Sequence, residues 1–385
     1  MTTTNPVSNL NPFHFLKYIR IVFKAQIVPA AVAKHPYERW FAPRNYSFIA
    51  IIIAVVFFTS CKKENIAGTV LNSATAGNSS AKAQTVGGGP SPNTSYGAFI
   101  RPPAKADDLS YQLNVADQLG IGYLREAVVV PSSGTDLVPE LNTKYKVLLN
   151  FSSTGSGEHK RVPFRTDLKR YKNDLNNILN TFTVMPVVAV IENEESNRFF
   201  YSGTASQYIN QLSAAISVMH ARSIKVSNGA ITRPGLNYLV YQDFLAQGKT
   251  DSAKRFKRLA HVTTDTATQH RSLFIDTLLT NYAQMNLDYV NFHWKDSVTN
   301  TDAINEVINY LVKRTGKTII TNELGQFDQD PNTLTALVQR CTDRNFPFII
   351  WYSPSESYKE KGYPLQHDDG TLTPTGIAYR DYLKD

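Results

Sequence analysis

Two groups of carboxylates stand where apolar segments of the chain end, and such groups could do acid–base chemistry. The segment TIIT, residues 318–321, runs directly into Asn322 and Glu323. The segment PVVAVI, residues 186–191, runs into four polar residues in succession: Glu192, Asn193, Glu194 and Glu195. Carboxyl groups that meet across a site can act as a nucleophile and as a general acid or base. Whether these two groups meet depends on the elements that position them.

Apolar segments alternate with amphipathic ones through most of the chain. Helical segments such as 108–120, which ends at Gly120, and 330–341, which begins with Asp330 and Pro331, have the expected start and stop residues. This alternation predicts a (β/α)8 TIM barrel over residues 95–385. An open doubly wound sheet is the alternative, but no Gly-rich turn follows the first apolar run. The eight runs are 96–100, 123–130, 146–151, 186–191, 224–228, 289–294, 318–321 and 346–352.

The ends of the expected strands indicate where a site would form. Active sites of (β/α)8 barrels lie at the carboxyl ends of the strands, so Glu194 after the fourth run and Glu323 after the seventh would converge at the barrel mouth. Both Trp residues of residues 61–385 also stand at strand ends, which favours a role in a site over one in the core. The other strand ends add further candidates: Arg125 on the second run, Asn291, His293 and Trp294 on the sixth, and Trp351 and Tyr352 on the eighth.

This order of residues resembles the clan A glycoside hydrolases, which are retaining enzymes on a (β/α)8 barrel. In that clan the acid/base Glu follows an Asn at the end of strand four, and the nucleophile Glu ends strand seven. Asn193–Glu194 and Glu323 match those positions, and Glu323 is followed by Gly325, as in the clan's strand-seven pattern. The resemblance therefore implies that Glu194 is the acid/base and Glu323 the nucleophile of a glycosidase.

The resemblance also implies a set of carbohydrate-binding residues. Arg125 matches the strand-two arginine near the nucleophile, and His293 with Trp294 matches the strand-six position. Trp351 matches the aromatic floor of the sugar site, because an indole face packs on the apolar face of a pyranose. Asn193 would donate to the sugar 2-hydroxyl group. We expect a carbohydrate substrate, no cofactor and no metal, since the sequence lacks HExxH and paired-Cys motifs.

Three alternatives stay open at this stage. Many clan members have Pro after the acid/base Glu, whereas this chain has Glu195, so Glu192 or Glu195 could be the acid instead of Glu194. The chain could also be a barrel that binds carbohydrate without turnover, or a structural protein of the cell envelope. Each of the named side chains could also be structural: a strand-ending Glu, a core Trp or a buried ion pair.

The N-terminal region predicts export. Residues 48–58 form an uninterrupted apolar run that suits a signal peptide, and Cys61 follows it after Thr59 and Ser60. This pattern resembles the lipobox of bacterial lipoproteins, in which the Cys receives the lipid; an uncleaved anchor is the alternative. We expect residues 1–60 to be an extension and signal peptide, and residues 61–94, rich in Gly, Ser, Ala, Asn and Thr, to be a flexible tether. The protein would then be lipid-anchored in the bacterial outer membrane or cell envelope.

Charge and cysteine content exclude other classes of function. The chain has a net charge of +8, but residues 1–60 hold six Lys/Arg and one Glu, and no basic stripe lies elsewhere. We therefore expect no nucleic-acid partner, and we expect a monomer. With Cys61 carrying lipid, Cys341 has no partner for a disulfide, and its place in a helical segment predicts a small core residue rather than a catalytic thiol.

Overall fold

The computed structural model describes residues 89–104, 106–131, 137–153, 161–358 and 364–384. The predicted extension and signal peptide, the lipidation site Cys61 and most of the tether lie outside these residues, so they stay predictions. Among the helices of the described ranges, none combines the length and apolar character that a membrane span requires.

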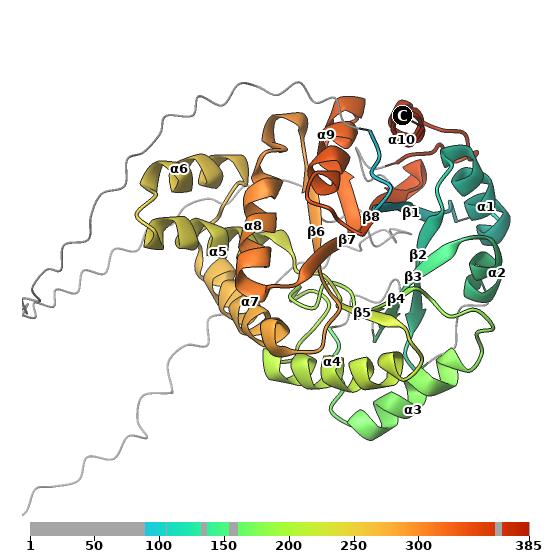
Figure 1. Ribbon diagram of the computed structural model, residues 1–385, viewed down its shortest axis with the longest axis horizontal. Helices are drawn as coiled ribbons and strands as arrows, with labels where there is room; N and C mark the ends of the chain where they lie inside the picture. The colour runs from blue at the N-terminus through green and yellow to red at the C-terminus, as the bar shows by residue number, and fades with distance from the viewer. Residues whose placement is uncertain (1–88, 105, 132–136, 154–160, 359–363, 385) are drawn as a thin grey trace, which may run out of the picture. The chain divides into compact units, whose positions relative to one another are not determined.

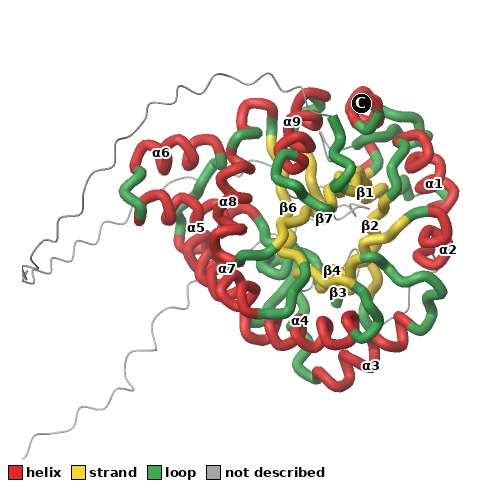
Figure 2. The backbone as a smooth tube through the Cα atoms, in the orientation of Figure 1, coloured by secondary structure: helices red, strands yellow, loops and turns green. Residues whose placement is uncertain are grey.

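Eight parallel strands close into a barrel, and helices surround it (Figures 1 and 2). Strand β1 pairs with both β2 and β8, which closes the sheet and excludes an open doubly wound fold. The predicted (β/α)8 barrel is therefore confirmed. The strands are β1 Ser95–Arg101, β2 Tyr123–Val129, β3 Lys146–Ser152, β4 Val188–Ile191, β5 Lys225–Asn228, β6 Tyr289–Asp296, β7 Thr318–Gln326 and β8 Phe348–Pro354.

The helices begin and end at residues that satisfy their free backbone groups. The Asp107 carboxylate accepts hydrogen bonds at the start of α1, and Gly120 ends that helix at φ 68°, where a residue without a Cβ is favoured. Asp330 caps α9, as its sequence predicts. The helices are α1 Asp108–Leu119, α2 Leu137–Lys144, α3 Leu168–Leu179, α4 Ala205–His220, α5 Arg233–Ala246, α6 Thr250–Leu259, α7 Thr266–Gln284, α8 Ala303–Thr315, α9 Pro331–Thr342 and α10 Pro374–Tyr382.

The apolar core has two layers because alternate strand residues face opposite sides of the sheet. The larger layer fills the space between strands and helices and includes Cys341, which is fully buried. Burial raises the pKa of the Cys341 thiol, as suits a core residue. The smaller layer fills the barrel interior below the mouth. Its fully buried residues are Leu148, Val188, Val190, Ile320 and Ile350.

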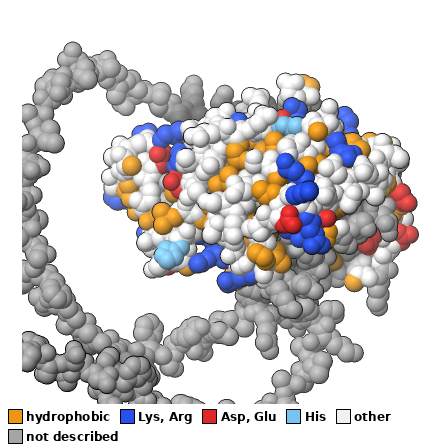
Figure 3. Space-filling model, turned by 90° about the horizontal axis from the view of Figure 1, so that it is seen from below, with side chains coloured by type: hydrophobic (Ala, Val, Ile, Leu, Met, Phe, Trp, Pro, Cys, Tyr) orange, Lys and Arg blue, Asp and Glu red, His pale blue; other side chains and the backbone are white. Residues whose placement is uncertain are grey.

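The long segment between β5 and β6 forms three helices where a regular barrel has one. Helices α5 and α7 pack on each other, and α6 packs on α5 and lies farther from the strands (Figure 1). On the face shown in Figure 3, Lys and Arg side chains are scattered among apolar and acidic side chains and do not form one stripe.

Candidate active site

A β-bulge in β7 positions Glu323 at the mouth of the barrel. Three consecutive residues of β7 lie opposite two residues of β6 on one side. On the other side, three residues of β7 lie opposite two residues of β8. Asn322 and Glu323 both point inward, since Asn322 binds interior side chains and Glu323 binds two cations. In a regular strand, neighbouring residues point to opposite faces, and the extra residue of the bulge removes this restriction. Bulges often re-aim side chains next to active sites. The sequence places Glu323 correctly but gives no sign of the bulge.

Two cations hold Glu323 in its ionised form. The Arg125 guanidinium donates to Oε2 at 2.7 Å, and the Lys295 ammonium lies 2.9 Å from Oε1. Burial alone would raise the pKa of Glu323, but the charges of His293, Lys295 and Arg125 outweigh it and hold the pKa well below its usual range. An anionic carboxylate held in place is what covalent attack requires.

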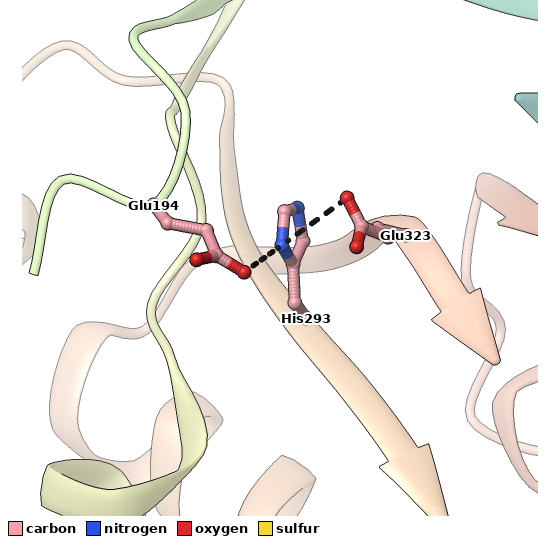
Figure 4. A group of neighbouring side chains, drawn as sticks. All are labelled: Glu194, His293 and Glu323. Carbon is pink, nitrogen blue, oxygen red and sulfur yellow. Dashed lines mark hydrogen bonds and ion pairs between the residues drawn. The ribbon is translucent and has the colours of Figure 1, made fainter. Parts of the chain in front are cut away.

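Glu194 lies across the mouth from Glu323, with His293 between them (Figure 4). Its Oε1 is 3.0 Å from His293 Nδ1, and its Oε2 accepts a hydrogen bond from Asn197 Nδ2 at 2.7 Å. His293 Nδ1 is also 3.6 Å from Glu323 Oε2. A carboxylate oxygen from each Glu and one His293 nitrogen all lie within 4.8 Å of one another.

Glu194 is the strand-four carboxylate that reaches the mouth. Its side chain is 18% exposed, whereas Glu192 and Glu195 are 0% and 1% exposed as whole residues. Glu192 accepts hydrogen bonds from Ser153, Tyr201 and Gln211. Glu195 accepts from Asn228 and Tyr282. Both are therefore structural carboxylates behind the strand end, and the alternative acids of the sequence analysis are set aside.

A sharp backbone turn at the end of β4 determines which of the three glutamates reaches the mouth. Glu192 and Glu194 have φ values of 68° and 54°, in the left-handed region that residues with a Cβ rarely adopt. Such strain is retained where the surrounding structure determines it, often at functional sites. The turn directs two glutamates into the core and Glu194 into the mouth.

Arg125 joins three strand ends. Besides Glu323, it donates from Nε to Asn150 Oδ1 at 3.1 Å and from Nη2 to Asn193 Oδ1 at 2.7 Å. Its guanidinium also lies over the Phe99 ring, 4.5 Å from the centroid. Arg125 is 3% exposed, so its role is to hold Glu323 and Asn193 in register. Arg125, Asn193, His293 and both carboxylates are thus brought together as predicted.

Trp294 and Trp351 are not at the mouth, and this corrects the sequence analysis. Both are fully buried in the layer between strands and helices. The Trp351 ring is 6.4 Å from that of Tyr379 on α10, and Trp294 packs under Arg233 at the start of α5. Each follows an inward-facing residue on its strand, and the alternation of a strand turns it outward.

Other residues occupy the positions that the two Trp were expected to fill. Tyr352, one residue after Trp351, lies under the Lys295 ammonium at 4.5 Å and near Phe99 at 5.8 Å between ring centroids. Phe199 and Phe327, which follow the ends of β4 and β7, are 52% and 53% exposed. The alternation along β8 could have identified Tyr352, whereas Lys295 at the end of the sixth run was overlooked.

Glu194, His293 and Glu323 offer three atoms close enough to surround a metal ion. However, Arg125 and Lys295 already neutralise Glu323, and both would repel a further cation at that carboxylate. We therefore interpret the three side chains as acid–base groups.

Gly229, just after β5, keeps the β4 turn in place. An added Cβ would lie 2.7 Å from the Ile191 oxygen and 2.8 Å from the Glu192 carbonyl carbon, and Gly229 O accepts from the Glu194 N–H. Gly229→Ala should therefore displace Glu194 and lower any activity that needs it, by on the order of 10²-fold for a shift of 1 Å. Gly122→Ala is the control, since nothing lies within 4 Å of its Cβ. Equal kinetics for the two variants would contradict this role.

Glu195 makes stability depend on pH. Burial raises its pKa to about 7, above the value of about 4.3 for an unfolded chain. The folded state therefore favours the neutral form of Glu195. The stability that this preference adds to the fold is lost as pH rises from about 4.3 to about 7. Above that range the buried charge costs about 4 kcal/mol. We expect Glu195→Gln to gain about this much unfolding free energy over the wild type between pH 4 and 8. Glu140→Gln, on the exposed face of α2, should show no such gain.

The comparisons with known proteins find similarity among solved structures alone. No protein-family model matches the sequence, and no curated protein matches it. The chain is similar to a GH128 endo-β-1,3-glucanase from Sorangium cellulosum, at 12% identity and a TM-score of 0.49, covering 75% of this chain and 98% of that one. It is similar to a GH128 endo-β-1,3-glucanase from Amycolatopsis mediterranei, in complex with laminaritriose and laminaribiose, at 10% identity and a TM-score of 0.46, covering 74% and 98%.

A family 39 glycoside hydrolase from Bacteroides cellulosilyticus WH2 is also similar, at 12% identity and a TM-score of 0.49, covering 76% of this chain and 64% of that one. These structural neighbours are glycoside hydrolases. At such identities and TM-scores they say nothing about the activity of this chain, which has to be inferred from its own side chains.

Proposed function

We propose that this protein is a retaining glycoside hydrolase that cleaves O-glycosidic bonds of poly- or oligosaccharides. The observation behind this proposal is the pair Glu194 and Glu323, whose carboxylate oxygens approach within 4.8 Å at the mouth of the barrel. Retaining enzymes hold their two carboxyl groups about 5–5.5 Å apart, and inverting enzymes about 6.5–9.5 Å apart, to leave room for a water. The short separation favours retention.

The two carboxylates differ in environment, and this difference supports different roles for them. Glu323 faces two cations and stays ionised, so it would attack the anomeric carbon while the bond to the leaving oxygen breaks. The proton on that leaving oxygen would come from Glu194. In the second step Glu194 would take a proton from water, the water oxygen would attack the anomeric carbon, and the bond to Glu323 would break.

The surroundings of the pair suit a sugar. Phe99 and Tyr352 form an aromatic wall beside Glu323, and such faces pack on apolar faces of pyranose rings. Phe199 and Phe327 expose half of their surfaces after the ends of β4 and β7. Exposed rings after the same strands as the two carboxylates are positioned to contact neighbouring sugars of a longer substrate.

One comparison tests the proposed activity. The domain from Ser95 would be assayed with aryl-glycosides of several sugars and with a panel of polysaccharides, and the anomer first released would be identified by proton NMR. We expect turnover and retained configuration. Binding to a glycan without turnover would favour the inactive carbohydrate-binding barrel instead. An inverted first product would contradict the two-step mechanism.

We also propose that the barrel is attached to the bacterial cell envelope through lipid on Cys61. The apolar run at residues 48–58 and the small residues before Cys61 support this proposal. Expressed from the full sequence, the wild type should sediment with membranes and incorporate labelled fatty acid. Cys61→Ser should lose the label, and a labelled Cys61→Ser variant would contradict the assignment.

A further inference from the structure

His293 sits between the two carboxylates, and the side chains behind it determine which of its nitrogens carries hydrogen. Arg125 fixes the first of these side chains, because its guanidinium can only donate. Arg125 Nε donates to Asn150 Oδ1 at 3.1 Å, so the amide oxygen of Asn150 faces Arg125. Asn322 Nδ2 donates to the same oxygen at 3.0 Å. The orientation of the Asn322 amide is thereby fixed.

The Asn322 amide oxygen consequently faces His293. It accepts from Asn291 Nδ2 at 2.6 Å and lies 2.9 Å from His293 Nε2. The orientation of Asn291 has an independent check, since its Oδ1 accepts the Asn322 backbone N–H at 3.1 Å. An oxygen that already acts as acceptor needs a donor from His293, so Nε2 carries the hydrogen. Asn150, Asn291 and Asn322 are all fully buried, and water cannot replace these partners.

Because Nε2 carries a hydrogen and donates it to Asn322, Nδ1 is the nitrogen that faces the carboxylates. It lies 3.0 Å from Glu194 Oε1 and 3.6 Å from Glu323 Oε2. Glu323 is ionised and can only accept. If Nδ1 and Glu194 both lacked hydrogen, two sets of lone pairs would face each other at hydrogen-bond distance. One proton must therefore lie between Nδ1 and Glu194, either as an imidazolium N–H or as a carboxylic O–H.

We propose that Glu194 and His293 bind this single proton jointly and act as one acid–base unit. The inference rests on the proposed function, in which Glu194 is the acid. His293 does not touch the substrate in this scheme; it is a positioning residue that keeps a proton on the unit. When the proton passes to the leaving oxygen, the unit is left with none, and the water of the second step restores it. Protons balance over one turnover.

The charges around His293 agree with such a unit. Glu194 and Glu323 face His293 directly, Arg125 and Lys295 pair with Glu323, and Glu195 interacts with His293 electrostatically. The paired cations offset the charge of Glu323. Burial raises the pKa of Glu194, as does Glu323, but the hydrogen bond and charge of His293 outweigh them and set that pKa below its ordinary value. Without His293, burial and the charge of Glu323 would together raise this pKa.

The first test is the pH dependence of kcat/KM on an aryl-glycoside with a poor leaving group. Two groups that share a proton bind it at least as tightly as Glu194 alone. We expect His293→Gln to move the basic limb of the profile to lower pH by about one unit or more. His220→Gln is the matched control, because His220 Nε2 pairs with Asp288 at 2.7 Å outside the site. A uniform loss of activity with an unmoved basic limb would overturn the proposal.

The second test does not depend on activity. Nitrogen-15 NMR of labelled protein, with the His293 signals assigned by triple-resonance experiments, should show a hydrogen on Nε2 and a proton shared between Nδ1 and Glu194. In Glu194→Gln, which has no carboxylate to share the proton, Nδ1 should carry no hydrogen and accept from the Gln amide. A neutral His293 with hydrogen on Nδ1 would overturn the proposal even if His293→Gln failed to fold. If no glycoside is hydrolysed, the proposed function fails, whereas these spectra still decide whether the proton is shared.

Discussion

Glu323→Ala should abolish hydrolysis, and azide should restore cleavage of the glycosidic bond by forming a glycosyl azide of inverted configuration. Without the carboxylate no covalent intermediate forms, so turnover should fall by roughly 10⁴–10⁶-fold, the range found when a covalent nucleophile or its partner is removed. Azide is a small anion that fits beside Arg125 and Lys295, which lose the Glu323 carboxylate in this variant. A single displacement by azide would give a glycosyl azide of inverted configuration.

Stability needs a separate control in this experiment. Removing one partner of a buried ion pair costs about 3–5 kcal/mol, because the other charge is left buried. Glu323→Gln keeps the shape and a carbonyl oxygen for Arg125, so it should remain folded while equally inactive. Circular dichroism and thermal unfolding would compare both variants with the wild type. Substantial activity in a folded Glu323→Gln variant would remove Glu323 from the nucleophile role.

The sequence predicted the barrel and the meeting of Glu194 and Glu323, the proposed catalytic pair, for the same reason. Apolar runs in strict alternation with amphipathic segments dictate a parallel barrel, and such a barrel brings all strand ends to one mouth. Glu194 and Glu323 are 129 positions apart in sequence, yet this topology alone places them together. No detailed side-chain geometry was needed for that inference.

The position of the aromatic wall could not be obtained in the same way. Trp351 and Tyr352 are neighbours on β8, so one faces the mouth and the other faces the helices. Which of the two faces the mouth depends on which alternate residues of β8 point inward, and Ile350 is one of the inward residues. The resemblance to the clan's aromatic floor favoured Trp351. Counting every second residue from the inward-facing Ile350 favours Tyr352 instead. The adjacent pair His293 and Trp294 follows the same rule.

The selection of Glu194 from three glutamates also depended on local backbone geometry. Glu192 and Glu194 have left-handed φ values at a turn that packs closely against Gly229, and a run of polar residues gives no sign of this turn. The bulge in β7 is similar, since it depends on the pairing of three strands. Sequence patterns report periodicity well, whereas these irregular turns arise from contacts between distant segments.

Glu194→Ala should lower turnover by an amount that depends on the leaving group. General acid catalysis contributes typically 10²–10⁴-fold, and the larger loss is expected for sugars and other poor leaving groups that need a proton. Activated aryl-glycosides need little protonation in the first step, so the glycosyl-enzyme should still form and accumulate. A burst of released phenol followed by slow turnover would show that accumulation.

Azide distinguishes Glu194 from its two neighbours. In Glu194→Ala, azide needs no general base and should attack the accumulated glycosyl-enzyme, so two displacements would give a glycosyl azide of retained configuration. Glu195→Gln is the matched control: its amide oxygen can still accept from Asn228 and Tyr282, and Glu194 remains. That variant should show neither rescue nor dependence on the leaving group. If Glu195→Gln were rescued and Glu194→Ala were not, the acid would be the buried glutamate, and the left-handed turn at the end of β4 would have to open during catalysis.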